Sequence, residues 1–364
     1  MASVLITGGA GFIGRRLALA LRADGHAVAV YDNFHPQVHT APQEALEALE
    51  ALEAAGIAVT RADIRDGAAL GAALAAGRPD TIVHLAAETG TGQSYDLPAH
   101  YCDVNVTGTS RLVEAIRAAR ADGIPVARVV LAGSRAVYGE GACVDGHGRR
   151  ATAVPRRAED MAAGDFAPKD AGGQRLTPVP TRSTVTPVSP ASVYASTKLM
   201  QEWVLGQALW QSGISCAILR LQNVYGAGQA LHNPYTGVLS IFARQLLDGR
   251  TLNIFEDGAI VRDFVYVTDV VEAFRLLCTA KDVPLHPVDI GTGRETTILE
   301  VARMMMSALG LPTDRFRITG DFRPGDIRYA VADLTDAREG LGFAPSVPLE
   351  EGIERLVAWT RETL

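Results

Sequence analysis

Tyr194 and Lys198 lie four residues apart in the run Tyr194-Ala195-Ser196-Thr197-Lys198, so a helix would place both side chains on one face. A phenol has a pKa of about 10 and is a poor base at neutral pH, but a nearby ammonium stabilises its ionised form. Tyr194 could then take a proton from a hydroxyl while a hydride leaves the same carbon. Taken alone, the spacing fits a packed tyrosine beside a solvated lysine better.

Ser134 is a candidate third member of this set. It ends the run Val129–Ser134, which is predicted to be a buried strand. Ligands of open parallel sheets bind at the carboxyl ends of the strands, so the hydroxyl would face the same crevice. We expect Ser134 to hydrogen-bond the reacting oxygen and to steady Tyr194. Without that context it is only a polar residue at a strand end.

Glycines near the N-terminus predict a dinucleotide site. Gly8, Gly11 and Gly14 follow a predicted strand directly and open a helix. Gly8 permits a tight turn, and Gly11 lets a pyrophosphate approach the free N–H groups of the helix N-terminus. Gly14 allows the helix to pack closely on the strand. We expect this turn, with Phe12 and Ile13, to bind the cofactor.

The adenosine end has its own candidates. Asp32 ends the predicted second strand and is followed by Asn33. A carboxylate there accepts hydrogen bonds from the ribose hydroxyls and repels a 2′-phosphate, which favours NAD over NADP. Asp63 and Ile64 end the predicted third strand, Val59–Ile64, and could bracket the adenine or simply form a turn.

The elements that must position these residues alternate along the first half of the chain. Alternation of buried strands with helices predicts an α/β Rossmann fold, a doubly wound parallel sheet with helices on both faces. The expected strands are Val4–Thr7, Ala27–Tyr31, Thr81–Leu85, Arg128–Ala132 and Ser215–Leu221, and the expected helices are Phe12–Ala23, Ala68–Ala76 and Val106–Ala121.

The second half predicts a smaller α/β substrate-binding domain. It holds short strands at Thr251–Phe255 and Val261–Val267, a turn at Asn233–Gly237, and helices up to Leu247 and at Val270–Ala280, Glu300–Leu309 and Leu349–Thr363. We predict a cofactor domain of residues 1–222, to which 262–289 return, and a nucleotide-sugar domain of 223–261 and 290–364.

Two stretches are unusual. Glu44–Ala55 repeats Glu-Ala-Leu and predicts a helix. A surface helix with its leucines packed down is the favoured interpretation, and a partner-binding helix is the alternative. Glu140–Ser189 is rich in Pro, Gly, Arg and Asp and has little periodicity, so it predicts a long surface excursion. A lid over the substrate and a tolerated insertion fit it equally.

Composition limits the partners. The 364 residues carry a net charge of −7, which argues against nucleic acid because its phosphates would be repelled. The four cysteines are scattered singly, so neither a metal site nor a disulfide framework is indicated. The N-terminus lacks the pattern of a signal peptide, and no run is long enough to span a bilayer. These features predict a cytoplasmic protein without a membrane partner.

Beyond these patterns, the chain resembles the extended short-chain dehydrogenases/reductases of the nucleotide-sugar epimerase/dehydratase family. The matching segments follow the family's order: TGGAGFIG, YDN, ADIRD, HLAAETG, GSRAVYG, YASTK, LRLQNVYG, VRDFVYVTDV and RPGDIR. The resemblance implies that Ser134, Tyr194 and Lys198 are catalytic and that Leu85, Ala86 and Ala87, with Tyr194 and Lys198, line the cofactor. It implies a homodimer and a nucleotide-diphosphate sugar as substrate, contacted by Asn223, Phe255, Arg262 and Arg323.

The residues after Ser134 narrow the reaction. Dehydratases of the family carry an Asp-Glu pair there to eliminate water, whereas this chain has Arg135 and Ala136. A 4-epimerase needs only a hydride that leaves C4 and returns. The segments 36–39 and Gln229–Gly237 are similar to those of dTDP-L-rhamnose 4-epimerases, which interconvert dTDP-L-rhamnose and dTDP-6-deoxy-L-talose. A UDP-sugar 4-epimerase, a reductase of a 4-keto-6-deoxysugar nucleotide and, less so, a non-catalytic NAD-sensing regulator are the alternatives.

Overall fold

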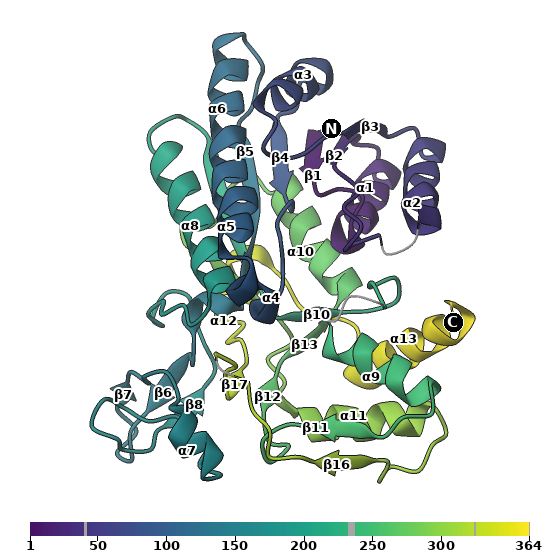
Figure 1. Ribbon diagram of the computed structural model, residues 1–364. Helices are drawn as coiled ribbons and strands as arrows, with labels where there is room; N and C mark the ends of the chain where they lie inside the picture. The colour runs from purple at the N-terminus through teal and green to yellow at the C-terminus, as the bar shows by residue number, and fades with distance from the viewer. Residues whose placement is uncertain (40–41, 232–236, 324, 364) are drawn as a thin grey trace.

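The computed structural model describes residues 1–39, 42–231, 237–323 and 325–363 (Figure 1). Its main feature is a seven-stranded parallel sheet in the order β14-β9-β5-β4-β1-β2-β3. The strands are β1 (Ser3–Thr7), β2 (Ala27–Asp32), β3 (Ala58–Arg61), β4 (Thr81–His84), β5 (Arg128–Ser134), β9 (Ser215–Leu221) and β14 (Val288–Ile290).

Helices cover both faces of this sheet, as β1 shows. Val4 and Ile6 point into one core, and Leu5 points into the other. The first core is completed by α1 (Phe12–Ala23), α2 (Pro42–Ala54) and α10 (Val267–Thr279). The second is completed by α3 (Gly67–Gly77), α6 (Gly108–Ala121) and α8 (Val193–Ala208). The predicted doubly wound α/β fold is therefore confirmed.

Strand order places the ligand crevice. β1 lies between β2 and β4, so the chain leaves β1 first toward one edge of the sheet and later toward the other. The loops after β2 and β4 therefore diverge around the end of β1 and leave a hollow there. Every predicted catalytic or cofactor residue of the first half comes at or shortly after the carboxyl end of a strand, apart from Tyr194 and Lys198 on α8.

Some predicted bounds were wrong. β3 ends at Arg61, so Asp63 and Ile64 lie in the following loop rather than at the strand end. β4 ends at His84, which leaves Leu85 outside the strand. α6 begins at Gly108, because a π-helical segment, Cys102–Thr107, precedes it. Of the leucines in α2, Leu52 is fully buried, but Leu46 is exposed rather than packed down.

The second half holds three small sheets, and two of them form a core with three helices (Figure 1). The sheets pair β10 (Asn223–Tyr225) with β13 (Phe264–Tyr266), β11 (Leu252–Ile254) with β16 (Phe316–Ile318), and β12 (Val261–Arg262) with β15 (Thr296–Thr297) and β17 (Tyr329–Ala330). The sheet of β12, β15 and β17 adds no described residue to that core. The helices are α9 (Val238–Leu247), α11 (Ile298–Ala308) and α13 (Leu349–Thr363). The domain boundaries stay a prediction. The turn predicted at Asn233–Gly237 lies, up to residue 236, outside the described residues.

The excursion at 140–189 has its own structure. It holds an antiparallel sheet of β6 (Ala142–Val144), β7 (Arg150–Ala151) and β8 (Thr177–Val179) beside α7 (Ala158–Ala162). Arg156, whose side chain is only 3% exposed, joins it to the second half. Its guanidinium bonds Glu140 at 3.0 Å, Glu256 at 2.8 Å and the Asp326 carbonyl at 2.8 Å. The excursion is therefore anchored at this point.

The Arg156 cluster yields a stability prediction. Arg156→Leu would leave the buried carboxylates of Glu140 and Glu256 short of a partner, and losing one member of a buried pair costs about 3–5 kcal/mol. We expect the free energy of unfolding, measured in urea, to fall by about 3 kcal/mol. Arg149→Leu is the control, because Arg149 in the same excursion makes a solvated pair with Asp145. Equal effects of both substitutions would contradict the anchoring role.

Candidate active site

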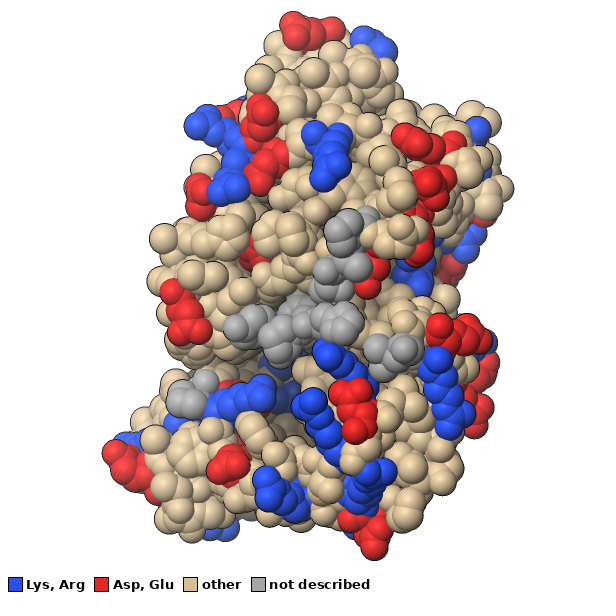
Figure 2. All heavy atoms as spheres, turned by 45° about the vertical axis from the view of Figure 1, so that its right-hand side comes forward, with Lys and Arg blue, Asp and Glu red and all other residues tan. Residues whose placement is uncertain are grey.

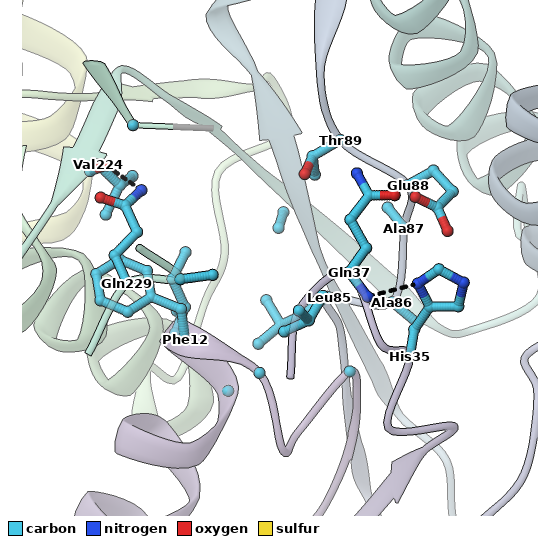
Figure 3. A pocket seen from close by; sticks show the side chains of 18 of the residues that line it. Phe12, His35, Gln37, Leu85, Ala86, Ala87, Glu88, Thr89, Val224 and Gln229 are labelled. Atoms are coloured by element: carbon cyan, nitrogen blue, oxygen red, sulfur yellow. Dashed lines mark hydrogen bonds between the residues drawn. The ribbon is translucent and has the colours of Figure 1, made fainter. Parts of the chain in front are cut away.

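A cavity of about 620 Å³ lies at the carboxyl edge of the sheet (Figure 3). Segments after β1, β2, β4, β5 and β9 line it together with α8. Of the predicted site residues, the lining contains Gly8, Gly11, Phe12, Ile13, Gly14, Asp32, Asn33, Ile64, Leu85, Ala86, Ala87, Ser134, Tyr194, Lys198 and Asn223. Residues from distant parts of the sequence are thus brought to one hollow.

The glycine turn has the space that a diphosphate needs. Gly8 has φ +71°, and a Cβ on Gly14 would lie 2.2 Å from the Gly8 carbonyl oxygen, so neither position accepts a side chain. A Cβ on Gly11 would stay 3.4 Å from the nearest atom outside its chain neighbours and would occupy the cavity instead. No side chain caps the N-terminus of α1. Its free N–H groups and dipole suit an anion, so the turn fits NAD.

Asp32 is buried and ties the two sides of the cofactor crevice together. Its carboxylate accepts hydrogen bonds from the Ala10 N–H at 2.9 Å and the Phe34 N–H at 2.7 Å. A carboxylate has about four acceptor positions, so two are left for ribose hydroxyls.

Asp63 is placed differently from the expectation. It does not line the cavity, and its carboxylate bonds the Arg65 guanidinium at 2.8 Å and the Asn33 amide at 3.2 Å. The bond from Arg65 is the main reason that the pKa of Asp63 falls to about 2. Ile64 and Ala62, on either side of it, line the cavity instead.

The three predicted catalytic residues meet in the cavity. Ser134 ends β5, and Tyr194 and Lys198 lie on the first two turns of α8, whose N-terminus is capped by Ser192. Burial raises the pKa of Tyr194, while a hydrogen bond with Ser134 and the charge of Arg135 lower it. Burial lowers the pKa of Lys198 to about 8, against the opposing effect of Glu202. The Tyr194 phenol and the Lys198 ammonium thus both line a poorly solvated part of the cavity.

The predicted substrate residues fall into two groups. Asn223 lines the cavity, whereas Phe255, Arg262 and Arg323 do not. Those three lie elsewhere. The Arg323 guanidinium carbon lies 4.7 Å from the centre of the Phe255 ring, and Arg262 bonds Asp326 at 2.6 Å. Figure 2 shows further basic side chains gathered over the lower half of the face turned forward. The role of these residues stays a prediction.

Several polar residues of the site were missed from the sequence. Asn105, in the π-helical segment, bonds the Glu88 N–H at 2.7 Å and the Thr197 hydroxyl at 3.0 Å. It thereby holds the loop after β4 against α8. Gln201 accepts a hydrogen bond from the Lys198 ammonium. Gln37, in the loop after β2, pairs with Gln93 in the helix Thr91–Asp96, which follows β4. Gln37 lies in the segment 36–39 singled out above, but nothing there assigned it a role. Asn105 and Gln201 belong to no periodic or spaced motif, and the π-helical segment, a feature common at functional sites, is seen only in the structure.

Part of the segment Gln229–Gly237 lies within the described residues. Gln229, Ala230, Gly237 and Val238 line the cavity, and the Gln229 amide bonds the Val224 carbonyl at 3.4 Å (Figure 3). Residues 232–236, which carry most of that resemblance, lie outside the described residues.

Fold and site together define a Rossmann-type dinucleotide enzyme with a Ser-Tyr-Lys set beside the cofactor crevice. Residues 4–291 match the model of the NAD dependent epimerase/dehydratase family. The chain belongs to this family, and it is an NAD-dependent enzyme of the extended short-chain dehydrogenase/reductase type.

Several of its relatives are named as 4-epimerases. A dTDP-L-rhamnose 4-epimerase of Burkholderia thailandensis is 40% identical over 99% of this chain and 95% of its own length. A UDP-glucose 4-epimerase of Mycolicibacterium smegmatis is 35% identical over 98% of both chains. The crystal structure of a Thermus thermophilus UDP-glucose 4-epimerase in complex with NAD matches with a TM-score of 0.76, 29% identity and 99% coverage of both chains.

The close approach at Gly14 gives a binding prediction. In Gly14→Ala the added carbon must displace main-chain atoms of Gly8 and Gly9 from the turn. We expect the Kd for NAD, measured by calorimetry, to rise at least tenfold, which corresponds to a loss of about 1.4 kcal/mol of binding free energy. The control is Gly71→Ala in α3, where a Cβ meets nothing within 4 Å. Unchanged NAD affinity in Gly14→Ala would refute the proposed place of the pyrophosphate.

Proposed function

We propose that this chain is a nucleotide-sugar 4-epimerase whose catalytic residues are Ser134, Tyr194 and Lys198. The observation that carries the proposal is their meeting in one cavity with the glycine turn, while Arg135 and Ala136 follow Ser134. Neither side chain can act as the acid or base of a dehydratase. A hydride that leaves C4 and returns needs no more than this set and a bound NAD.

Each residue has a distinct part in the reaction. NAD held at the glycine turn would supply the acceptor and donor for the hydride of the sugar C4. Tyr194 takes the C4 hydroxyl proton as the ketone forms and returns it after the sugar has turned. Ser134 holds the same oxygen by a hydrogen bond. Lys198 and Arg135 supply positive charge that favours the phenolate over the phenol.

A pair of glutamines between the segments after β2 and β4 favours a cofactor that stays bound, and thereby an epimerase over a reductase. Gln37 and Gln93 exchange amide hydrogen bonds at 2.9 and 3.2 Å, and the Tyr101 hydroxyl adds a bond to Gln93 at 3.0 Å. Because β1 lies between β2 and β4, this pair links the two segments that flank the end of β1. A reductase exchanges its cofactor in every cycle, whereas an epimerase must keep it while the keto-sugar turns.

The substrate that we propose is a dTDP-6-deoxyhexose such as dTDP-L-rhamnose, which becomes dTDP-6-deoxy-L-talose. The 40% identical relative and segments 36–39 and 229–237 support it. The 35% identical relative supports a UDP-sugar as the alternative. We assign the diphosphate to Asn223, Arg262 and Arg323, since guanidinium groups bind phosphate through paired hydrogen bonds, and the base to the neighbourhood of Phe255.

Purified enzyme without added cofactor tests the proposal on dTDP-L-rhamnose, UDP-glucose and GDP-mannose, with products followed by NMR. We expect C4 epimerisation of the first, and loss of about a thousandfold in turnover for Tyr194→Phe, because the proton acceptor is gone. NAD content should be unchanged in that variant. Turnover only of a 4-keto-sugar, and only with added NADH, would identify a reductase, and normal turnover of Tyr194→Phe would refute the catalytic assignment.

We also propose a homodimer that pairs through α8. Met200, Trp203 and Trp210 lie on one outward face of this helix and its end, and all three are exposed. The neighbouring helix α4 (Thr91–Asp96) adds exposed Tyr95, and exposed Leu97 lies between α4 and α5 (Pro98–Tyr101). Such an apolar face is costly in water, and a second copy of α8 would cover it.

A cytoplasmic location stays a prediction. No described helix is long and apolar enough to cross a membrane.

The dimer is tested at Trp203. Trp203→Glu would put a charge at the centre of the contact and weaken association by about 2 kcal/mol or more, as for a buried interface tryptophan. Analytical ultracentrifugation should then detect monomers at concentrations where the wild type is dimeric. Leu285→Glu is the control, because Leu285 is fully exposed outside these helices. A dimer unaffected by Trp203→Glu would rule out this face.

A further inference from the structure

The Lys198 ammonium is held by a residue that the proposed reaction does not mention. Its Nζ donates a hydrogen bond to Gln201 Oε1 at 2.6 Å, one turn further along α8. Gln201 is completely buried, and Lys198 is 4% exposed. An ammonium has three N–H groups, so this bond leaves two for ligands in the cavity that Lys198 lines.

Thr109 determines which way the Gln201 amide points. The Thr109 hydroxyl donates its only hydrogen to the Asn105 carbonyl at 2.6 Å, so its oxygen can otherwise only accept. Gln201 Nε2 donates to that oxygen at 2.8 Å. A flipped amide would set its carbonyl oxygen against an oxygen without a hydrogen to give. Gln201 Oε1 is therefore committed to face Lys198.

His84 closes the cluster without adding charge. Its Nε2 lies 2.9 Å from the same Thr109 oxygen and must carry the proton, while Nδ1 lies 2.7 Å from the Thr7 hydroxyl and accepts from it. Burial, and next the charge of Lys198, lower the pKa of His84 to about 3. His84 is neutral at working pH, and its hydrogen bonds reach Thr7, just before the glycine turn.

The charged groups around Lys198 leave its charge unpaired. The carboxylate that acts on it is Glu202, next to Gln201 on α8, and Glu202 is itself bonded by Arg220 of β9 at 2.7 and 3.0 Å. His84 on β4 is neutral, and Thr109 on α6 and Ser134 on β5 carry no charge. Tyr194, one turn before Lys198, is the ionisable group left to respond to the ammonium.

We propose that Gln201 is a positioning residue for Lys198: a neutral acceptor, locked by Thr109, that holds the ammonium at the cavity without cancelling its charge. A carboxylate at this position would hold the ammonium equally well but would neutralise it. An apolar side chain would leave the charge and remove the hold. The inference rests on the proposed role of Tyr194 and Lys198.

Gln201→Glu tests the charge, and Gln174→Glu, at an exposed position of the 140–189 excursion, is the matched control. With Lys198 neutralised, the pKa of Tyr194 should rise by about one unit or more. We expect the pH at which kcat reaches half its maximum to shift upward by the same amount, with KM and NAD content unchanged. The tyrosinate absorbance of the holoenzyme, less that of Tyr194→Phe, should shift in parallel. The control should titrate like the wild type.

Gln201→Met tests the hold. The methionine side chain has a similar volume but no oxygen to accept the hydrogen bond. We expect kcat to fall about tenfold, equally at every pH, as for a misplaced catalytic group. An unchanged Tyr194 titration in Gln201→Glu overturns the inference, as does a kcat of Gln201→Met within twofold of the wild type. If Gln201→Glu does not fold, Gln201→Met decides. A wild type inactive on every sugar would refute the proposed function instead, which separates the two failures.

Discussion

The parallel arrangement of β4, β1 and β2 is the constraint on which the rest of this structure depends. Parallel strands end at the same edge, so the glycine turn after β1, Asp32 at the end of β2 and Leu85 after β4 meet without any contact between them in sequence. Hydrogen bonds across this edge then tie the loops together. The cavity is a consequence of strand order, and side chains only shape it.

Burial of charge is the second condition, and the molecule meets it in two ways. Arg156 and Arg220 are paired with carboxylates: the first anchors the 140–189 excursion, and the second anchors the carboxyl end of β9 against α8. Lys198 is buried too, but its partner is an amide. A buried ammonium with a neutral partner keeps its field, and the field is what a neighbouring phenol can use. The two arginines that hold the structure together therefore pair with carboxylates, whereas the lysine of the proposed catalytic set pairs with a neutral amide.

The excursion illustrates where sequence patterns lose their value. Glu140–Ser189 has no helical or strand period, and neither a lid nor an insertion could be preferred from its composition. In the structure its small sheet is held by Arg156 to Glu256 and to the loop that carries Asp326. These contacts join residues about 100 and 170 positions apart. No local pattern contains them.

Local sequence determined the elements and most of the site. The glycine spacing, the apolar strand runs and the Tyr194–Lys198 interval are short-range features, and the sterics of a turn or the period of a helix convert them directly into structure. Tertiary structure alone decided the partners: that Asp63 turns to Arg65, that Phe255 and Arg323 stack outside the cavity, and that Thr109 orients Gln201. Hydrogen bonds and buried charges are satisfied by whichever group the fold brings within about 3 Å, and sequence spacing does not carry that distance.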